Sequence, residues 1–346
     1  MSIRSLYLRN FRNYVESEVH FSPKQNLFYG ENAQGKTNLL EAISLIATGR
    51  SFRTSRLQEL IHEGAPFFYL EAKVCKNGFE HTVKIAYDGV ERKLTLDGNS
   101  YLNLQHLLGL VPSVFFTPSD VELTDGAPAI RRRFLNLHLA QRDPLYIHHL
   151  SRYLRAMKQR NALLRSNDLS AIECWETEMG VSSEYLWKAR LQFLEGIQEP
   201  LKRNGHFLSS EKECYEIRPH FGYQGSYLEQ LQKNRPRERQ LGLTLAGPHR
   251  DDFSLLINGK SASLFGSEGQ KKSAAFALRL AEWALFGNEG AAIFCIDDLG
   301  VHLDLIRKGL FSKSLESLGQ VFVTAPELAD FLVGAKLFQI AEGSIC

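Results

Sequence analysis

A glycine-rich segment near the start of the chain sets the strictest limit on its architecture. The sequence G-E-N-A-Q-G-K-T runs from Gly30 to Thr37, and the apolar residues 27–29 before it are typical of a buried strand. Residues 38–41 after it are typical of the first turn of a helix. Glycines at this spacing let the backbone fold back, so that successive N–H groups face one anion at the helix N-terminus. The pattern therefore predicts a phosphate-binding loop for a nucleoside triphosphate.

The residues of this loop have expected roles toward ATP and Mg²⁺. Lys36 would reach the β- and γ-phosphates as a catalytic residue, and the Thr37 hydroxyl would bind Mg²⁺. The plainer alternative is a glycine-rich turn with a solvated lysine, but it does not account for the strand before the segment and the helix after it. The residues predicted to bind ATP here are Gly30, Glu31, Asn32, Ala33, Gln34, Gly35, Lys36 and Thr37.

The composition is that of a globular protein with a sizeable core. The chain has 346 residues, of which 44% are hydrophobic and 23% charged, and its formal net charge is only +2. Any nucleic-acid surface must therefore be a local patch. The five cysteines are scattered and form neither a disulfide framework nor a C-x-x-C metal pair. We expect a cytoplasmic protein with no membrane partner, because the sequence has no apolar run of spanning length and no signal-peptide core.

A second motif lies in the last quarter of the chain, where Ser267 precedes a long helix rich in alanine and leucine. Ser267 stands at the expected N-cap, and Gly269 and Gln270 follow in the first turn. A helix N-terminus led by serine and glycine can bind an anion, although the same pattern also fits an ordinary capped core helix. We therefore include Ser267, Gly269 and Gln270 among the predicted ATP-binding residues, as a signature-like motif.

Residues 291–298, A-A-I-F-C-I-D-D, have the form of a buried strand that ends in two carboxylates. This is the form of a Walker B motif. Asp297 would hold Mg²⁺ through water, and Asp298 would polarise the attacking water, so both are predicted to be catalytic. In isolation, such a pair after a strand could equally be a helix cap.

Two further features follow the carboxylate pair. Leu303-Asp304 stand at the spacing of a D-loop, the segment that meets a second subunit in cassette-type ATPases. Thr324 ends another apolar strand, at the place where a γ-phosphate sensor would sit, and is predicted to contact ATP. The phosphate-binding loop, the signature-like helix, the Asp-Asp strand and this last strand occur in a single order, which favours an ATPase over four unrelated structural features.

Strands dominate the remainder of the first 120 residues. Residues 3–9 and 15–21 alternate apolar with polar, and the turn between them carries Arg12, which could reach a bound nucleotide or could simply be solvated. Residues 67–101 read as short strands joined by Asn-Gly and Asp-Gly turns. An N-terminal strand pair leading into a phosphate-binding loop is suggestive of ATP-binding-cassette heads, with an antiparallel β-subdomain.

Residues 131–165 have a helical pattern with nine basic side chains and one acidic side chain. A helix that packs one face and offers a cationic one can contact nucleic-acid phosphates. The alternative is internal neutralisation, because residues 166–199 carry seven acids and two bases and could form an antiparallel partner helix. The candidates for DNA contact are Arg131, Arg132, Arg133, Arg152, Arg155 and Lys158.

The separation of Lys36 from Asp297 predicts an inserted lobe. We expect a discontinuous ATPase head from residues 1–120 and 241–346, and a mainly helical lobe from residues 121–240, in which 200–240 read as loop and short strand. In cassette-type ATPases the signature serine completes the site of a second subunit. ATP would then hold two copies together as a homodimer, and hydrolysis would release them.

Several motifs together resemble the RecF family of bacterial recombination-repair proteins, and the matches run from residue 8 to about residue 324. They are L-x-N-F-R-N-Y (8–14), G-E-N-A-Q-G-K-T-N (30–38), G-R-S-F-R (49–53), F-F-T-P-S-D-V (115–121), G-x-P-x-x-R-R-R-F-L-N (126–136), G-P-H-R-D-D (247–252) and S-E-G-Q-K-K (267–272). The resemblance implies an α/β fold: an ABC/SMC-like P-loop ATPase head, with a mixed sheet flanked by helices, an antiparallel β-subdomain and an inserted mainly helical lobe.

The resemblance also implies a function. It implies a DNA-stimulated ATPase that acts as a binding switch, dimerises on DNA with ATP, and helps to load recombinase at single-strand gaps. The implied partners are DNA gaps, single/double-strand junctions and duplex, together with RecO- and RecR-type proteins and recombinase. The sequence departs from the family at 301–304, where V-H-L-D replaces Ser-Glu-Leu-Asp, and Thr324 is followed by Ala325-Pro326 rather than by hydroxyl residues. We therefore expect slow hydrolysis with ATP-driven dimerisation intact.

Two other functions fit an ATPase head of this kind. An SMC-like chromosome-organising head would need long coiled-coil arms, and the sequence lacks sustained heptads. The ATPase subunit of a membrane transporter is disfavoured by the basic helical segment and by the family motifs. Comparing the effects of DNA and of membrane extract on the ATPase rate distinguishes a repair protein from a transporter subunit.

Overall fold

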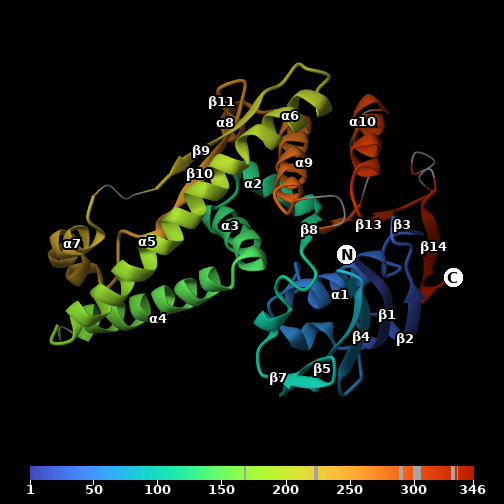
Figure 1. Cartoon of the computed structure of the whole chain (residues 1–346), viewed down its shortest axis with the longest axis horizontal. Coiled ribbons are helices and arrows are strands. Elements are labelled where there is room, and N and C mark those ends of the chain that lie inside the picture. Colours follow the sequence, from blue (N-terminus) through green and yellow to red (C-terminus); the bar gives the residue numbers. More distant parts are fainter. Residues whose placement is uncertain (167–168, 222–224, 288–290, 299–304, 329–331, 333) are drawn as a thin grey trace. The chain divides into compact units, whose positions relative to one another are not determined.

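The computed structural model describes residues 1–166, 169–221, 225–287, 291–298, 305–328, 332 and 334–346. The chain divides into two compact units (Figure 1). The first consists of Met1–Asp120, Phe207–Ser210 and Phe276–Cys346, and the second of Val121–His206 and Glu211–Ala275. Among the helices of the described residues, none combines the length and the apolar character that crossing a bilayer requires.

The first unit contains two six-stranded sheets. One is antiparallel, with the order β2-β1-β4-β5-β6-β7. Its strands are β1 (Ser2–Phe11), β2 (Tyr14–His20), β4 (Phe68–Lys76), β5 (Phe79–Tyr87), β6 (Arg92–Leu96) and β7 (Asn99–Tyr101). The other has the order β15-β14-β3-β13-β12-β8 and is parallel apart from its edge pair. Its strands are β3 (Gln25–Tyr29), β8 (Ser113–Phe116), β12 (Ile293–Ile296), β13 (Val321–Ala325), β14 (Lys336–Ala341) and β15 (Ser344–Ile345).

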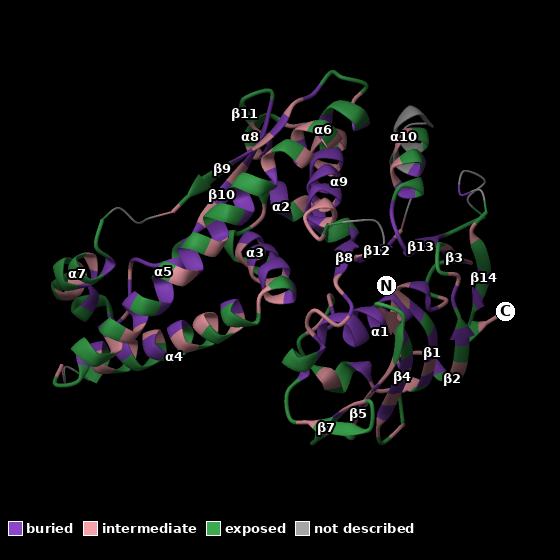
Figure 2. Cartoon of the chain, in the orientation of Figure 1, coloured by how far each residue is buried: buried purple, intermediate pink, exposed green. Residues whose placement is uncertain are grey.

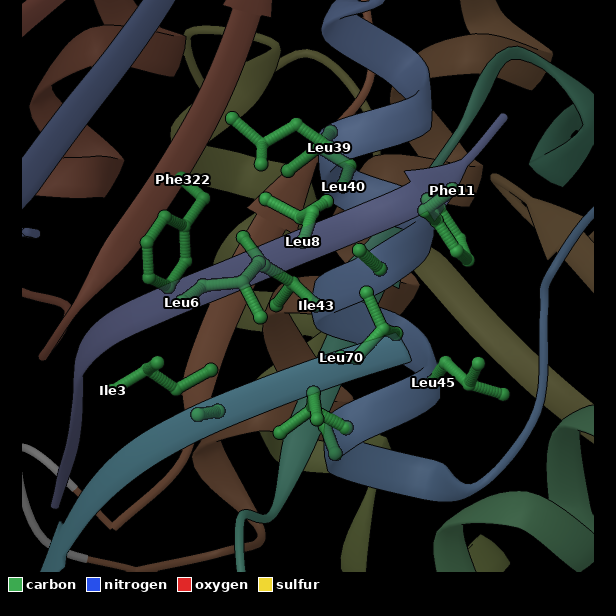
Figure 3. Packing of buried hydrophobic residues seen from close by; sticks show 14 of the residues in the cluster. Ile3, Leu6, Leu8, Phe11, Leu39, Leu40, Ile43, Leu45, Leu70 and Phe322 are labelled. Carbon is green, nitrogen blue, oxygen red and sulfur yellow. The ribbon is translucent and has the colours of Figure 1, made fainter. Parts of the chain in front are cut away.

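Helix α1 (Lys36–Thr48) contacts strands of both sheets. Figure 3 shows α1 side chains such as Leu40 and Ile43 among Leu6 and Leu70 of the antiparallel sheet and Phe322 of the parallel one. All five side chains are at most 1% exposed. The other helices wholly within this unit are α10 (Leu305–Glu316), η1 (Leu57–Leu60) and η2 (Leu104–Leu107). Because α1 packs all round, the turn that begins it is held firmly in place.

The parallel sheet brings the ends of its central strands together. β3 lies between β13 and β14, and β13 also pairs with β12, with Thr324 opposite Phe28 and Phe322 opposite Cys295. β8, β12 and β13 are buried along their whole length (Figure 2), as expected for parallel strands covered on both faces. The loop after β3 and the residues after β12 and β13 therefore meet at one edge, where ligands bind in open α/β sheets.

The second unit is mainly helical and contains a small antiparallel sheet of order β11-β10-β9. Its strands are β9 (Tyr215–His220), β10 (Asp252–Ile257) and β11 (Lys260–Ser261). Its helices are α2 (Glu122–Asp125), α3 (Pro128–Arg142), α4 (Pro144–Ser166), α5 (Ile172–Gly196), α6 (Gln198–Leu208), α7 (Tyr227–Leu241), η4 (Pro248–Arg250) and α8 (Ala262–Phe265). The helix η3 (Pro118–Val121) begins in the first unit, α6 enters it at its last two residues, and α9 (Glu268–Ala284) runs from the second unit into the first.

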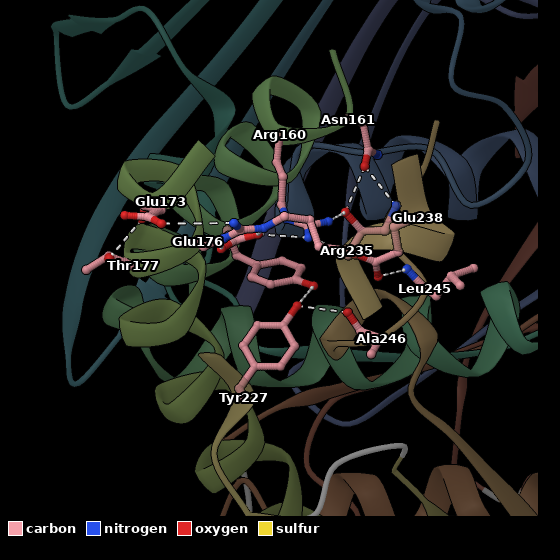
Figure 4. Close-up of polar contacts among 12 residues, drawn as sticks. Arg160, Asn161, Glu173, Glu176, Thr177, Tyr227, Arg235, Glu238, Leu245 and Ala246 are labelled. Atoms are coloured by element: carbon pink, nitrogen blue, oxygen red, sulfur yellow. Dashed lines mark hydrogen bonds and ion pairs between the residues drawn. The ribbon is translucent and has the colours of Figure 1, made fainter. Parts of the chain in front are cut away.

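A buried ion network holds α4, α5 and α7 together (Figure 4). Arg160 is fully buried and donates to Glu176 at 3.0 and 2.9 Å, and it also pairs with the buried Glu238 at 2.7 Å. Arg235 donates to the second oxygen of Glu176 at 2.5 Å. Two arginines thus compensate two buried carboxylates, as burial of charge requires.

Two expectations about this region were wrong. Residues 200–240, expected as loop and short strand, include the greater part of α6 and almost all of α7. Ser226 caps α7 by accepting from the Glu229 N–H, and Tyr227 and Leu231 are buried on one side. The first unit resumes at Phe276 rather than at residue 241. The residues just after 241 belong to the second unit because β10 pairs along its whole length with β9 of that unit. The predicted combination of a mixed sheet, an antiparallel β-subdomain and a mainly helical insertion is confirmed.

Candidate nucleotide-binding site

The predicted phosphate-binding loop lies between β3 and α1 in the first unit. Gly30 and Gly35 have φ angles of 148° and 119°, a conformation that favours glycine. A Cβ atom at Gly30 would lie 2.3 Å from the carbonyl oxygen of Ile340, and one at Gly35 would lie 2.7 Å from Nδ2 of Asn13. Gly35 is also the N-cap of α1 and makes no side-chain capping bond, so no N-cap side chain competes with an anion for the N–H groups of the first turn.

The Lys36 side chain lies along this loop. Its Nζ donates to the carbonyl oxygens of Gly30 at 2.5 Å and Glu31 at 2.6 Å. Lys36 is only 8% exposed. Burial lowers its pKa, and the nearby carboxylates of Asp298 and Asp297 oppose this effect. The ammonium group is thus held at the loop that would bind the phosphates.

Asp297, at the end of β12, accepts two hydroxyl hydrogen bonds on the same oxygen. Thr37 donates to Asp297 Oδ1 at 2.8 Å, and Thr324 donates to it at 2.9 Å. Burial raises the pKa of Asp297, while the hydrogen bonds from Thr37 and Thr324 counteract the rise. The three side chains come from α1, β13 and the segment after β12, and the parallel sheet brings them together as the sequence predicts.

These residues fit a magnesium-bound nucleotide. Mg²⁺ prefers oxygen ligands and usually takes one or two from the protein together with substrate phosphates and water. The Thr37 hydroxyl and the Asp297 carboxylate are such ligands and lie within hydrogen-bond distance of each other. No cluster of three or more His, Cys, Asp or Glu side chains suited to a metal occurs among the residues that the structure describes.

Thr324, the predicted γ-phosphate sensor, is hydrogen-bonded to the two residues that follow β12. Its side chain is buried, at 1% exposure, and its hydroxyl donates to Asp297 while accepting the N–H of Asp298 at 2.7 Å. A hydroxyl has one proton to donate, and here Asp297 takes it. Asp298 has a φ of 60°, which is uncommon for a residue with a side chain, and its bonded N–H helps to fix that conformation.

The sequence allowed Arg12 either to contact a nucleotide or to be solvated, and the structure shows its side chain hydrogen-bonded within the protein. Its guanidinium forms two hydrogen bonds of 2.8 Å with the two carboxylate oxygens of Glu41, and a third of 2.6 Å with the carbonyl of Glu59. Glu41 is fully buried on α1 and also accepts from Ser51. Arg12 thus neutralises a carboxylate just behind the loop.

The predicted signature residues lie in the second unit. Ser267 caps α9: its hydroxyl accepts from the Gln270 N–H at 3.3 Å, and its own N–H donates to Gln270 Oε1 at 3.0 Å. This is a reciprocal capping box, which confirms the predicted helix start. Ser267 is exposed, and Gly269 follows in the first turn. The D-loop prediction, including His302, falls on residues 301–304, outside the described part of the chain.

Three of the six candidate DNA contacts are engaged within the second unit. Arg131 binds both carboxylate oxygens of Asp252, at 2.6 and 2.9 Å, and is 8% exposed. Arg132 donates to the carbonyl of Asp251 at 3.1 Å. Arg152 binds both carboxylate oxygens of Glu178 on α5. The predicted pairing with an acidic partner helix therefore applies to Arg152 alone, since Arg131 pairs with a carboxylate outside residues 166–199 and Arg132 bonds to a backbone carbonyl.

The other three candidates are exposed. Arg133 has an interaction partner of its own, whereas Arg155 and Lys158 form no ion pair with any residue that the structure describes. Arg155 and Lys158 are three residues apart on α4 and belong to one exposed stripe of that helix. The members of this stripe are His148, Ser151, Arg155, Lys158, Ala162 and Arg165.

Sequence reasoning missed the residues that hold the loop from behind. Asn13 and Tyr14 at the β1–β2 turn bind the carbonyl oxygens of Gln34 and Gly35, at 2.9 and 3.0 Å. The N-F-R-N-Y segment was a visible signal, but only Arg12 was considered for a role. The hairpin of β14 and β15 was missed as well, although its turn also contacts the loop.

Comparison with known proteins places the chain among DNA repair ATPases. The family model described as the RecF/RecN/SMC N terminal domain matches residues 2–343. The DNA replication and repair protein RecF of Protochlamydia amoebophila is 43% identical over 97% of this chain and 98% of that protein. The protein of the same name from Chlamydia caviae is 39% identical over 100% of this chain and 98% of its own length.

Solved structures show the same family relationship. The structure of the recombination mediator protein RecF with ATP, in the RecFOR pathway, has a TM-score of 0.90 at 28% identity, covering 99% of this chain and 96% of that one. An SMC head bound to the C-terminal winged-helix domain of ScpA has a TM-score of 0.63 at 14% identity, covering 100% of this chain and 96% of that one, and shares the fold alone.

Proposed function

Because this chain belongs to the RecF family of DNA replication and repair proteins, we propose that it is an ATP-gated DNA-binding protein of recombinational repair and replication restart. It has the ATPase head of that family, and solved relatives hold ATP. In the proposed cycle, ATP drives two copies together on DNA, and hydrolysis separates them. The dimer helps to load recombinase at single-strand gaps.

One observation carries this proposal most directly. One carboxylate oxygen of Asp297 accepts hydrogen bonds from the hydroxyls of Thr37 and Thr324. Lys36 is hydrogen-bonded along the phosphate-binding loop. We propose that Lys36 and the N–H groups of the loop bind the phosphates, that Thr37 and Asp297 hold Mg²⁺, and that Asp298 orients the attacking water. Bound Mg²⁺ would neutralise the charge that develops on the phosphates.

The dimer would be completed by the signature residues. Ser267 is exposed at the capped start of α9, and Gly269 and Gln270 accompany it in the first turn. We propose that these residues contact the nucleotide of a second copy. The V-H-L-D sequence at 301–304 lacks the Ser and Glu that the family usually has, so we expect slow turnover that DNA stimulates.

For DNA contact we favour the exposed stripe of α4. Arg155 and Lys158 are free to meet phosphates, because no described carboxylate neutralises them. We propose that gaps, single/double-strand junctions and duplex are bound there, and that RecO- and RecR-type proteins and recombinase are the protein partners. Such work on chromosomal DNA would take place in the cytoplasm.

The test is the mass of the protein in solution with no nucleotide, with ATP and with ADP, each with and without gapped DNA. Lys36→Arg is measured in parallel, because it keeps the charge but not the compact ammonium geometry. We expect a dimer with ATP but not with ADP or without nucleotide. Lys36→Arg should remain a monomer even with ATP. A monomer under every condition would contradict the gating mechanism, while unchanged ATP binding in that case would show that only the dimer step is wrong.

The SMC-like head remains the second candidate, on its fold likeness. Such a head acts through long arms, whereas the longest described helices, α4 and α5, have 23 and 25 residues and pack on each other. We therefore expect no bridging of two DNA duplexes at a protein concentration that binds one. Efficient bridging would favour the chromosome-organising function.

A further inference from the structure

We infer that the β1–β2 turn sets the orientation of the phosphate-binding loop, with Asn13 and Tyr14 as positioning residues for phosphate binding. The inference rests on the proposed ATP-binding function and deepens it. Asn13 Nδ2 donates to the carbonyl of Gln34 at 2.9 Å, and the Tyr14 hydroxyl donates to the carbonyl of Gly35 at 3.0 Å. Two consecutive peptide groups of the loop are therefore held by two consecutive residues, Asn13 in the turn and Tyr14 at the start of β2.

The planarity of the peptide group turns these contacts into a constraint on the binding face. In a trans peptide, the C=O of one residue and the N–H of the next point in opposite directions. Fixing the carbonyls of Gln34 and Gly35 toward the β1–β2 turn therefore directs the N–H groups of Gly35 and Lys36 away from it. These N–H groups are the donors that a phosphate at the start of α1 would meet.

The donors are themselves fixed. Tyr14 is fully buried, and burial raises the pKa of its phenol beyond the physiological range, so it stays a donor. Asn13 Oδ1 accepts from Asn38 Nδ2 at 2.8 Å, which fixes the amide orientation and aims its NH₂ group at Gln34. Asn38 in turn accepts from Arg53 at 2.8 Å. The turn, the first turn of α1 and the following loop thus form one hydrogen-bonded unit.

The turn of the β14–β15 hairpin supports the first of these peptide groups. The Gly343 N–H donates to the Gln34 carbonyl at 3.0 Å, and the Glu342 N–H donates to Gln34 Oε1 at 2.6 Å. Gly343 has a φ of 72°, and a Cβ atom there would lie 2.2 Å from the Asn13 carbonyl oxygen. The two turns therefore pack against each other as well as on the loop.

The experiment compares wild type with Asn13→Ala, Tyr14→Phe and the double variant. Tyr7→Phe is the matched control, because it removes a hydroxyl from the same sheet that bonds to Glu16 rather than to the loop. Affinities for Mg²⁺-ATP and for inorganic tripolyphosphate are measured by calorimetry, and each variant's melting temperature is recorded. Tyr14→Phe keeps the buried ring, and the Gly35 carbonyl keeps its helical bond from Leu39, so this variant tests the hydroxyl alone.

We expect each single variant to weaken ATP binding by about threefold to tenfold and the double variant by more, because each loses one hydrogen bond to the loop. The affinity for tripolyphosphate should fall by the same factor, and Tyr7→Phe should leave both affinities unchanged. Wild-type ATP affinity in the double variant would overturn the inference, as would loss of ATP binding with tripolyphosphate binding intact. If wild type itself bound no ATP, the proposed function would fail instead.

Discussion

The Thr324 hydroxyl donates a hydrogen bond to the Asp297 carboxylate over 2.9 Å and accepts the N–H of Asp298 over 2.7 Å. One buried hydroxyl thus holds both carboxylate residues that follow β12. Asp297 shares the same oxygen with Thr37, so the hydroxyl of β13 and the hydroxyl of α1 fix one carboxylate between them. Thr324, which the sequence predicts to contact the γ-phosphate, is thus hydrogen-bonded to both carboxylate residues.

We predict that Thr324→Val lowers the ATPase kcat by about tenfold to a hundredfold while changing ATP affinity by less than about threefold. Valine has nearly the shape of threonine but leaves Asp297 and the N–H of Asp298 without their partner. Thr324→Ser, which keeps the hydroxyl, should retain most of the activity. A direct phosphate sensor would instead weaken ATP binding in Thr324→Val, and calorimetry with ATP and ADP distinguishes the two.

We predict that Arg160→Leu destabilises the protein by about 3–5 kcal/mol, because it leaves Glu176 and Glu238 close together and buried with only Arg235 to compensate them. Arg155→Ala is the control on the same helix, since that side chain is exposed and should change stability by about 0.5 kcal/mol or less. Urea unfolding followed by circular dichroism measures both. If Arg160→Leu were as stable as Arg155→Ala, a structural role for the network would be contradicted.

We predict that His249 makes folding less favourable in acid. Burial lowers the pKa of its ring to about 4, and the ring bonds to the Tyr153 hydroxyl at 2.7 Å and the Thr244 carbonyl at 3.0 Å. The unfolded chain binds a proton near pH 6.5 and the folded chain does not, so stability is fully present above that pH and falls as the pH drops toward 4. The loss should reach about 2 kcal/mol near pH 5.

The comparison for this prediction is His249→Gln, which should flatten that part of the pH profile. Unfolding curves measured between about pH 7 and pH 5 test it, with His148→Gln, an exposed residue of α4, as the control. If His249→Gln loses as much stability as wild type over this range, other groups carry the acid sensitivity.

We predict that Arg155→Ala and Lys158→Ala each weaken DNA binding uniformly across sequences and lower the slope of log K against log salt by about 1. The reason is that each removes one cation of the exposed α4 stripe that has no ion-pair partner in the described part of the chain. Lys202→Ala serves as the control, because its ammonium already lies 3.5 Å from Glu199 in the same unit. An unchanged salt slope in Arg155→Ala/Lys158→Ala would place the DNA surface elsewhere.

The parts of the site that could be predicted are those encoded by a local motif. Gly30, Gly35 and Lys36 lie where the loop pattern requires, and Asp297 ends a strand because its predecessors are a continuous apolar run. The central sheet followed from the same runs. Local spacing and burial pattern were sufficient, since each feature lies within a few residues of the motif that predicts it.

The parts that could not be predicted depend on partners far away in the sequence. The partner of Arg12 is Glu41, 29 residues away, and the partner of Arg152 is Glu178, 26 residues away, so neither pairing is visible in the local sequence. The polar α7 carries an internal Pro236, so its pattern did not indicate a helix, and its packing on α4 and α5 is tertiary. A one-dimensional pattern cannot show which of several carboxylates an arginine will meet.

The strand order has a consequence for how the protein is made. β3, which carries the phosphate-binding loop, pairs on both sides with strands from the last thirty or so residues of the described chain, and the hairpin turn at Gly343 closes on Gln34. A ribosome delivers the β1–β2 turn and the loop early, and the two strands that flank β3 much later. While β13 to β15 are still inside the exit tunnel, the nascent chain lacks both flanking strands and the Thr324 hydroxyl. The proposed nucleotide site can therefore be completed only after β13 and β14 have emerged, and a chain cut short before β13 would lack it however well its first sheet had folded.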